Sequence, residues 1–163
     1  MDILEKTLAL RIKTTDNIIS GRFISCPLAF TNKFKFQLTG SGDLLVSVGD
    51  TNADTYTTST TPIELEQEHD IVFSYNGDIS TSKLYVDGVE HTISDASVAY
   101  SSQGGDILIG TRQDGVYPFK GTIKDWQFHN RAWTEQEAKN YHNSFEKTEH
   151  KNKIADGGVG DTI

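Results

Sequence analysis

Three glutamates at alternate positions are the first residues of this sequence whose spacing could support chemistry. Glu64, Glu66 and Glu68, in the segment IELEQEHD, would share one face of a β-strand. Glycoside hydrolysis needs two carboxyl groups about 5 Å apart for retention, or about 6.5 to 9.5 Å apart for inversion. Ile63 and Leu65 alternate with the glutamates, so this row would lie on the solvent side of the strand, and no aromatic residue follows at a spacing suited to a cleft. We therefore expect no catalytic residue and no enzyme activity.

Histidine and cysteine add little reactive chemistry. The five histidines include no pair at the i, i+4 helical spacing or the tight strand spacing of a zinc site, so we expect His129 and His142 to be local hydrogen-bond partners or surface residues. Cys26 is the only cysteine, which excludes a disulfide within the chain, and we expect it to be a buried, apolar-like side chain. The sequence also lacks a Ser-His-Asp order, a G-x-S-x-G elbow and a phosphate-binding loop.

Tyrosines in predicted loops could instead bind a sugar. An exposed aromatic ring stacks on a pyranose face, and neighbouring planar polar groups orient the ligand. The segment TRQDGVY, residues 111–117, combines these features and is the first place to search. The candidate ligand-binding residues are Tyr56, Tyr100, Arg112, Gln113, Asp114 and Tyr117. The alternative is that one or more of these tyrosines pack over the rim of the fold.

The charge of the chain limits its partners. With 15 lysines and arginines against 23 aspartates and glutamates, the formal net charge is -8, so the protein repels polyanions and we expect no nucleic acid partner. No apolar run approaches the roughly 20 residues that span a bilayer, so we expect no membrane insertion. The first residues, MDILEKTLALRIK, have no extended apolar core, so we predict no secretory signal.

Short alternating strands must position these residues. Apolar and polar residues alternate over residues 8–13, 33–38, 44–48 and 71–75. Asp87-Gly88 predicts a two-residue hairpin turn between strands at 84–86 and 89–93. The Thr-rich segment 50–62 has no apolar face, and we expect a long exposed loop or an irregular edge strand there. Strands at this spacing, without a repeating βαβ pattern, indicate an all-β fold, an antiparallel two-sheet β-sandwich.

The segment FKGTIKDWQFHNRAWTEQEAKNYH, residues 119–142, changes from a strand pattern to a helix pattern. A slip in its alternation predicts a β-bulge near Lys124-Asp125, which would put Ile123, Trp126 and Phe128 on one face in the core.

A short C-terminal helix should follow this strand. Thr134 and Glu137 form a capping box, with Trp133 and Ala138 at the positions of a hydrophobic staple. Ala138, Tyr141 and Phe145 make a narrow apolar stripe, so the helix would lie on an edge of the sandwich or between its sheets. We therefore predict one domain over residues 1–146 and a polar, glycine-rich tail over residues 147–163.

Three segments together resemble one family. SYNGDISTSKLYVDGVEHTI is similar to its strand and hairpin with a Y-v-D-G turn, GDILIG to its penultimate strand, and FKGTIKDWQFHNRAWTEQEAKNYH to its closing strand and helix. The family is the laminin G-like, concanavalin A-like lectin/glucanase jelly roll, and the resemblance covers residues 63–143 most clearly. It implies a jelly-roll fold, and its members include lectins, adhesive modules, accessory domains of hydrolases and virion proteins.

The resemblance also implies a metal ion and sets the functional hypotheses. Sandwiches of this family often hold calcium with loop carboxylates and backbone carbonyls. The candidates here, in predicted loops or strand starts, are Asp50, Asp54, Asp106 and Asp114, and ordinary turn capping is their alternative role. We expect no obligatory cofactor. The first hypothesis is a non-catalytic recognition or adhesion domain that binds glycans or a cell-surface partner. The alternatives are a structural component of a phage or virus particle that assembles with itself or with other proteins, and an accessory domain of a glycoside hydrolase. We expect it on a virion or an extracellular surface.

Overall fold

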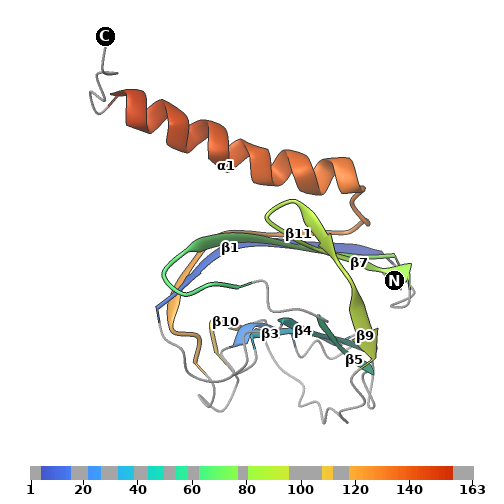
Figure 1. The fold of residues 1–163 in the computed structure, drawn as a ribbon. Helices are drawn as coiled ribbons and strands as arrows, with labels where there is room; N and C mark the ends of the chain where they lie inside the picture. The colour runs from blue at the N-terminus through green and yellow to red at the C-terminus, as the bar shows by residue number, and fades with distance from the viewer. Residues whose placement is uncertain are drawn as a thin grey trace.

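Two antiparallel β-sheets face each other in the computed structural model of this chain, and helix α1 (Glu135–Ala155) lies above one of them (Figure 1). The structure describes residues 5–15, 22–26, 33–38, 44–49, 54–58, 63–76, 81–95, 108–111 and 118–155. The first sheet has the order β11-β1-β6-β7-β8 and contains β11 (Gly121–His129), β1 (Lys6–Thr14), β6 (Glu68–Tyr75), β7 (Lys83–Val86) and β8 (Val89–His91). The second sheet has the order β10-β2-β3-β4-β5-β9 and contains β10 (Leu108–Ile109), β2 (Arg22–Cys26), β3 (Lys33–Leu38), β4 (Leu44–Gly49), β5 (Asp54–Thr58) and β9 (Ile93–Asp95). The predicted two-sheet β-sandwich is confirmed.

The main core fills the space between the two sheets. Alternate residues of the first sheet point into it and meet buried residues of β4 from the second sheet. Its buried members are Leu8, Leu10, Ile12, Leu44, Val46, Ile63, Ile71, Phe73, Leu84 and Val86. Because burying a side chain of this size contributes about 1.5 to 3 kcal/mol, this cluster dominates the stability of the sandwich.

A second, smaller core lies on the outer face of the first sheet. Ala9, Val72 and Tyr85 occupy the alternate positions that point away from the main core. Residues of α1 cover them, with Trp133 and Phe145 packed at the margin of the cluster. The helix therefore lies on the outer face of one sheet, which makes the fold three layers deep, and the predicted position on an edge or between the sheets is wrong.

Capping and hydrogen bonds fix where the helix starts. Glu137 N–H donates to Thr134 Oγ1 at 3.3 Å, and Thr134 N–H donates to Glu137 Oε2 at 2.9 Å, which confirms the predicted capping box. Just before the helix, Thr7 Oγ1 accepts from Trp133 N–H at 2.9 Å, and Ser74 Oγ donates to the Trp133 carbonyl at 2.8 Å. These bonds tie the chain to β1 and β6 at the point where the helix begins.

The helix is longer than the sequence predicts. It continues to Ala155, past residue 146, where we placed the end of the domain. In Figure 1 its C-terminal half rises away from the first sheet. Within the described residues, no helix combines the length and the apolar character that crossing a membrane requires.

The predicted bulge is present in β11. Lys124 pairs with Arg11 and Gln127 pairs with Ala9, so Asp125 and Trp126 both stand opposite Leu10. Asp125 has a positive φ of 49°. Two residues opposite one interrupt the alternation. As a result, Trp126 is 44% exposed, and its predicted place in the core is wrong.

The other two apolar residues predicted for the core face of this strand lie where we expected them. Ile123 and Phe128 pack against the main core, from positions opposite Ile12 and Leu8 of β1. The local pattern therefore predicted the bulge and two of its three apolar contacts.

The predicted hairpin is also confirmed. Asp87 and Gly88 have φ of 51° and 73°, the left-handed values that a type I′ turn requires. The strand after the turn is shorter than predicted, because β8 ends at His91 and Ile93 already starts β9 in the other sheet. Thr92 alone links the two sheets at this point.

Two other predictions from the strand pattern are wrong. Residues 64–67 form a turn before β6, with Glu66 at a φ of 60°, so only Glu68 of the three alternating glutamates is in a strand. The Thr-rich segment contains β5, which pairs with β4 on one side and β9 on the other and is therefore neither a loop nor an edge. Sheet pairing supplies the order that the side-chain pattern did not reveal.

Candidate functional site

Most of the predicted ligand and calcium residues lie outside the described residues. This holds for Tyr100, Arg112, Gln113, Asp114 and Tyr117, and for Asp50 and Asp106 of the calcium set. Asp54 is the first residue of β5, which agrees with the loop or strand start predicted for it, whereas Tyr56 lies within β5 and pairs with Val46 and Asp95, so it is not the loop residue that we predicted. Whether these residues bind a ligand or calcium stays a prediction.

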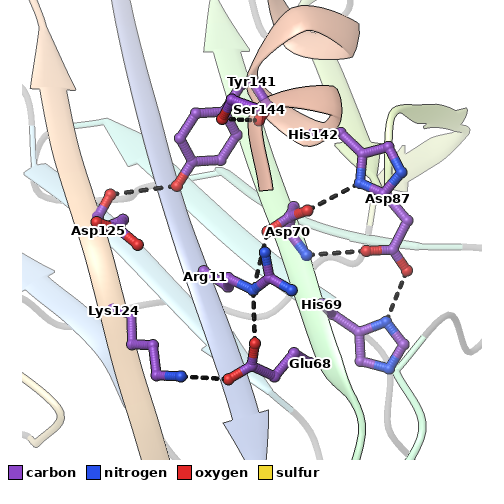
Figure 2. Close-up of polar contacts among 10 residues, drawn as sticks. All are labelled: Arg11, Glu68, His69, Asp70, Asp87, Lys124, Asp125, Tyr141, His142 and Ser144. Atoms are coloured by element: carbon purple, nitrogen blue, oxygen red, sulfur yellow. Dashed lines mark hydrogen bonds and ion pairs between the residues drawn. The ribbon is translucent and has the colours of Figure 1, made fainter. Parts of the chain in front are cut away.

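A polar network that the sequence did not predict lies between the first sheet and α1 (Figure 2). Strands β1, β6 and β11, the β7–β8 turn and the helix all contribute to it. Its members are Arg11, Glu68, His69, Asp70, Asp87, Lys124, Asp125, Tyr141 and His142.

Arg11 is the central cation of the network. Its Nε lies 2.8 Å from Glu68 Oε2 and 3.7 Å from Asp70 Oδ1, and its side chain is buried. The guanidinium also lies 4.5 Å from the centroid of the Phe145 ring, within the range of a cation–π contact. Lys124 forms a second ion pair with Glu68. The hydrogen bond from Lys124, with further attraction from Arg11, lowers the pKa of Glu68 against the opposing effect of burial.

Asp70 is the most deeply buried acid of the network. The residue is 4% exposed, and its Oδ2 lies 2.8 Å from His142 Nδ1 on the helix. Burial raises the pKa of Asp70, although His142 and Arg11 both favour its charged form. Its Oδ1 is buried and has no hydrogen-bond partner among the described residues. Arg11 Nε faces this oxygen at 3.7 Å, beyond hydrogen-bond distance.

Asp87 is held in place from two sides. Its Oδ1 accepts from Asp70 N–H at 2.8 Å, and its Oδ2 lies 2.7 Å from His69 Nδ1. His69 Nε2 accepts from the N–H of Glu64 at 3.0 Å, so the proton of the neutral ring is on Nδ1, which donates to Asp87. Burial opposes the charged form of Asp87, but the bonds from His69 and Asp70 outweigh it and lower the pKa of Asp87.

Asp70, Asp87 and His142 come together at the centre of this network. One ligand atom from each lies within 4.8 Å of the others, an arrangement that can hold a metal ion. His142 and Asp70 are 72 positions apart in the sequence. No spacing rule could have paired them, although the hairpin turn that carries Asp87 was itself predictable. His142 was expected to be a hydrogen-bond partner, and it is one, but to a distant strand rather than to its own neighbourhood.

Comparisons with known proteins agree with the fold. The CBM40 of IT-sialidase from Ruminococcus gnavus, bound to α2,3-sialyllactose, superposes with a TM-score of 0.64 at 17% identity, over 85% of this chain and 82% of that one. Domain 4 of an extracellular GH43 arabinanase from Geobacillus stearothermophilus, in complex with arabinotriose, gives 0.61 at 18% identity, over 83% and 65%. A heptameric SAP-like pentraxin from Limulus polyphemus gives 0.58 at 19% identity, over 83% and 68%. At such identities these structures share the fold and leave the ligand of this chain open.

The comparison of sequences identifies the family directly. No curated protein sequence matches the chain. The Laminin_G_3 family profile, described as concanavalin A-like lectin/glucanases superfamily, matches residues 5–139, from the residue before β1 into the first turns of α1. Because this match covers most of the chain, the protein belongs to the Laminin_G_3 family of the concanavalin A-like lectin/glucanases superfamily.

Proposed function

We propose that this chain is a non-catalytic glycan-binding module in which Trp126 is the stacking platform. The observation that carries the proposal is the bulge in β11. It leaves Trp126 44% exposed, although Ile123 and Phe128 of the same strand pack against the core. An exposed aromatic ring beside a few fixed polar groups is what a protein needs to bind a sugar ring.

The surroundings of Trp126 fit this role. Asp125 and Gln127, on either side, are exposed polar residues on the same strand. Asp125 has a positive φ of 49°, an unfavourable conformation for a residue other than glycine. Bulges re-aim side chains, and strained backbone tends to persist at binding sites. The cost of this conformation is therefore consistent with a role for the neighbouring indole.

The likeness in fold supports the same function class. Two structures of the same fold carry sialyllactose and arabinotriose; one is the CBM40 of a sialidase and the other is domain 4 of an arabinanase. The glutamate row considered for catalysis supports no enzyme, because most of it lies in a turn. An accessory role beside a catalytic domain fits this proposal, and so does an extracellular location. No finding favours assembly into a virus particle.

A glycan array with the purified chain tests the function. Two variants, one of Trp126 and one of Tyr117, then locate the site. We expect specific binding to at least one oligosaccharide. Trp126→Ala should weaken it at least about tenfold, which corresponds to roughly 1.4 kcal/mol. Val89→Ala is the matched control, because Val89 is an exposed apolar residue, 61% accessible, on the opposite edge strand of the same sheet.

The second variant, Tyr117→Ala, tests the loop predicted from the sequence. If Tyr117→Ala abolishes binding and Trp126→Ala does not, the module binds glycans but through residues 111–117 rather than through the bulge. If the wild-type chain binds no glycan on the array, the function itself is wrong.

A further inference from the structure

We propose that Asp70, Asp87 and His142 form a binding site for a divalent transition-metal ion of the Zn²⁺ class, which fastens helix α1 to the first sheet. The three residues come from β6, from the β7–β8 turn and from the helix. Their ligand atoms already lie within 4.8 Å of one another, so an ion could bind without refolding of any element.

The chemistry of the ligands selects the class of metal ion. Carboxylate oxygen and imidazole nitrogen are both ligands of Zn²⁺, and a water can be the fourth ligand of a three-residue zinc site, whereas Ca²⁺ takes six to eight oxygen ligands and no imidazole. Ligand atoms around a tetrahedral zinc ion are about 3.3 Å apart, given metal–ligand distances near 2.0 to 2.1 Å. Asp70 Oδ2 and His142 Nδ1 are 2.8 Å apart, so a separation of a few tenths of an ångström would admit the ion.

An oxygen without a hydrogen bond points to a ligand at this site. Asp70 Oδ1 is buried and accepts no hydrogen bond within the described residues, and its nearest cation there, Arg11 Nε, is 3.7 Å away and closer to Glu68. A buried carboxylate oxygen without a hydrogen bond is costly. Asp70 Oδ2 is the oxygen next to His142 Nδ1, so an ion that binds both oxygens of this carboxylate would also satisfy Oδ1.

The charges of the network leave room for a cation. Glu68, Asp70 and Asp87 supply three negative charges when ionised, against two positive charges from Arg11 and Lys124. Arg11 and Lys124 both pair with Glu68. Arg11 Nε also faces Asp70 Oδ1, but only at 3.7 Å, so the network keeps one negative charge in excess, which a divalent ion could neutralise.

The site is also reachable and held in shape. The side chains of Asp87 and His142 are 36% and 25% exposed, so an ion and a bound water can enter from solvent. Behind them, His69 Nδ1–H holds Asp87, and the Glu64 N–H holds His69. Such outer hydrogen bonds fix metal-binding carboxylates in position. An ion bound by all three residues would take the place of the hydrogen bond between His142 Nδ1 and Asp70 Oδ2.

The test is the melting temperature of the metal-stripped chain with ZnCl₂, CoCl₂ or CaCl₂ added alone. Zinc at about 100 times its dissociation constant should raise the melting temperature by roughly 5 to 10 °C, and cobalt should develop visible absorption on binding. His142→Ala and Asp70→Asn should each lose the zinc-induced rise. His129→Ala is the matched control and should keep it, because His129 lies at the far end of β11 and contacts Gln127 instead.

The quantity compared between variants is the rise in melting temperature caused by zinc. A variant that merely melts at a lower temperature without zinc is therefore not evidence for the site. If His142→Ala does not fold, His142→Gln replaces it. No rise with zinc in the wild type, or an equal rise in the histidine and aspartate variants, overturns the proposal and leaves the three residues as a metal-free hydrogen-bonded cluster. An effect of calcium that survives in His142→Ala reports the separate loop site predicted from the sequence, and does not support this one.

Discussion

At the residue scale, single backbone positions decide whether neighbouring strands can pair. Gly121 opens β11 with a φ of 147°, and a Cβ there would overlap the carbonyl oxygen of Lys13 and lie 2.9 Å from Thr14 Cα. Both atoms belong to the backbone of β1 and cannot rotate away. The close approach of the two strands therefore depends on a residue without a side chain.

Gly121→Ala should accordingly be severely destabilising. Overpacking against backbone and an unfavourable φ together should lower the free energy of unfolding by about 3 kcal/mol or more. Gly110→Ala is the control, because Gly110 has a similarly unfavourable φ of 80° but a Cβ there would only touch Ile123 at 3.8 Å. Urea denaturation compares the two, and equal losses would show that strain alone, rather than contact with β1, explains the effect.

The capping box gives a second prediction at this scale. Arg131 contacts Glu137 through Nη1 at 2.9 Å and Nη2 at 2.5 Å, and Thr134 N–H donates to the same carboxylate. These bonds lower the pKa of Glu137 from 4.5 to about 2, and the hydrogen bond from Arg131 has the largest effect. Since the folded pKa lies below the unfolded one, the stabilisation is present above about pH 4.5 and is lost as the pH falls toward 2.

Melting curves between pH 2 and 7 test this contribution. Glu137→Gln should be less stable than the wild type above pH 5, and the two proteins should converge near pH 2. Glu146→Gln changes an exposed acid of the same helix outside the capping box and should not reproduce the pattern. A constant difference between wild type and Glu137→Gln at every pH would contradict the assignment.

At the scale of elements, α1 owes its position to a few side chains. Tyr141 is buried in the second core, its ring lies 5.9 Å from Trp133 and 5.0 Å from Phe145, and its hydroxyl donates to the Asp125 carbonyl at 3.2 Å. Burial raises the pKa of this hydroxyl. The residue thus joins the helix to β1 and to the bulge at once.

Tyr141→Ala should therefore loosen the helix. We expect a loss of about 3 to 5 kcal/mol, as for other large aromatic truncations, while Tyr141→Phe should lose only about 1 kcal/mol with its hydroxyl. Chemical denaturation measures both, and hydrogen exchange of the α1 amides shows whether the loss is confined to the helix. If Tyr141→Phe is as damaging as Tyr141→Ala, the hydroxyl bond rather than the packing holds the helix.

Local patterns predicted the elements, and long-range contacts decided their use. The Asp87-Gly88 turn, the bulge and the Thr134–Glu137 box depend on neighbours a few positions away, so the sequence was sufficient for them. The apolar stripe on the helix was also predictable. The surface that this stripe covers was not predictable, because it is formed by Ala9, Val72 and Tyr85 from three separate strands.

The candidate sites were harder to predict for the same reason. Trp126 has the apolar character of a core residue, and only the pairing of β11 with β1 turns it outward. Asp70 and Asp87 read as an ordinary strand residue and a turn residue until the helix brings His142 to them. The loop tyrosine predicted to bind sugar, Tyr117, lies outside the described residues.

At the scale of the whole molecule, the domain boundary can be tested directly. Phe145 packs on the sheet, and the helix itself continues to Ala155. A chain ending at residue 146 should keep its melting temperature within about 2 °C of the full chain and should bind the same glycans. A larger loss would place the rest of α1 inside the folded unit, and the predicted boundary would be wrong.

The connection between β8 and β9 couples the two sheets closely. His91 is the last residue of the first sheet and Ile93 the first of the second, with Thr92 between them. A linker of one residue cannot extend, so strand β8 cannot separate from its sheet without displacing β9 in the other sheet. The sandwich should therefore lose both sheets in one cooperative step, and any force on one edge would be shared by both.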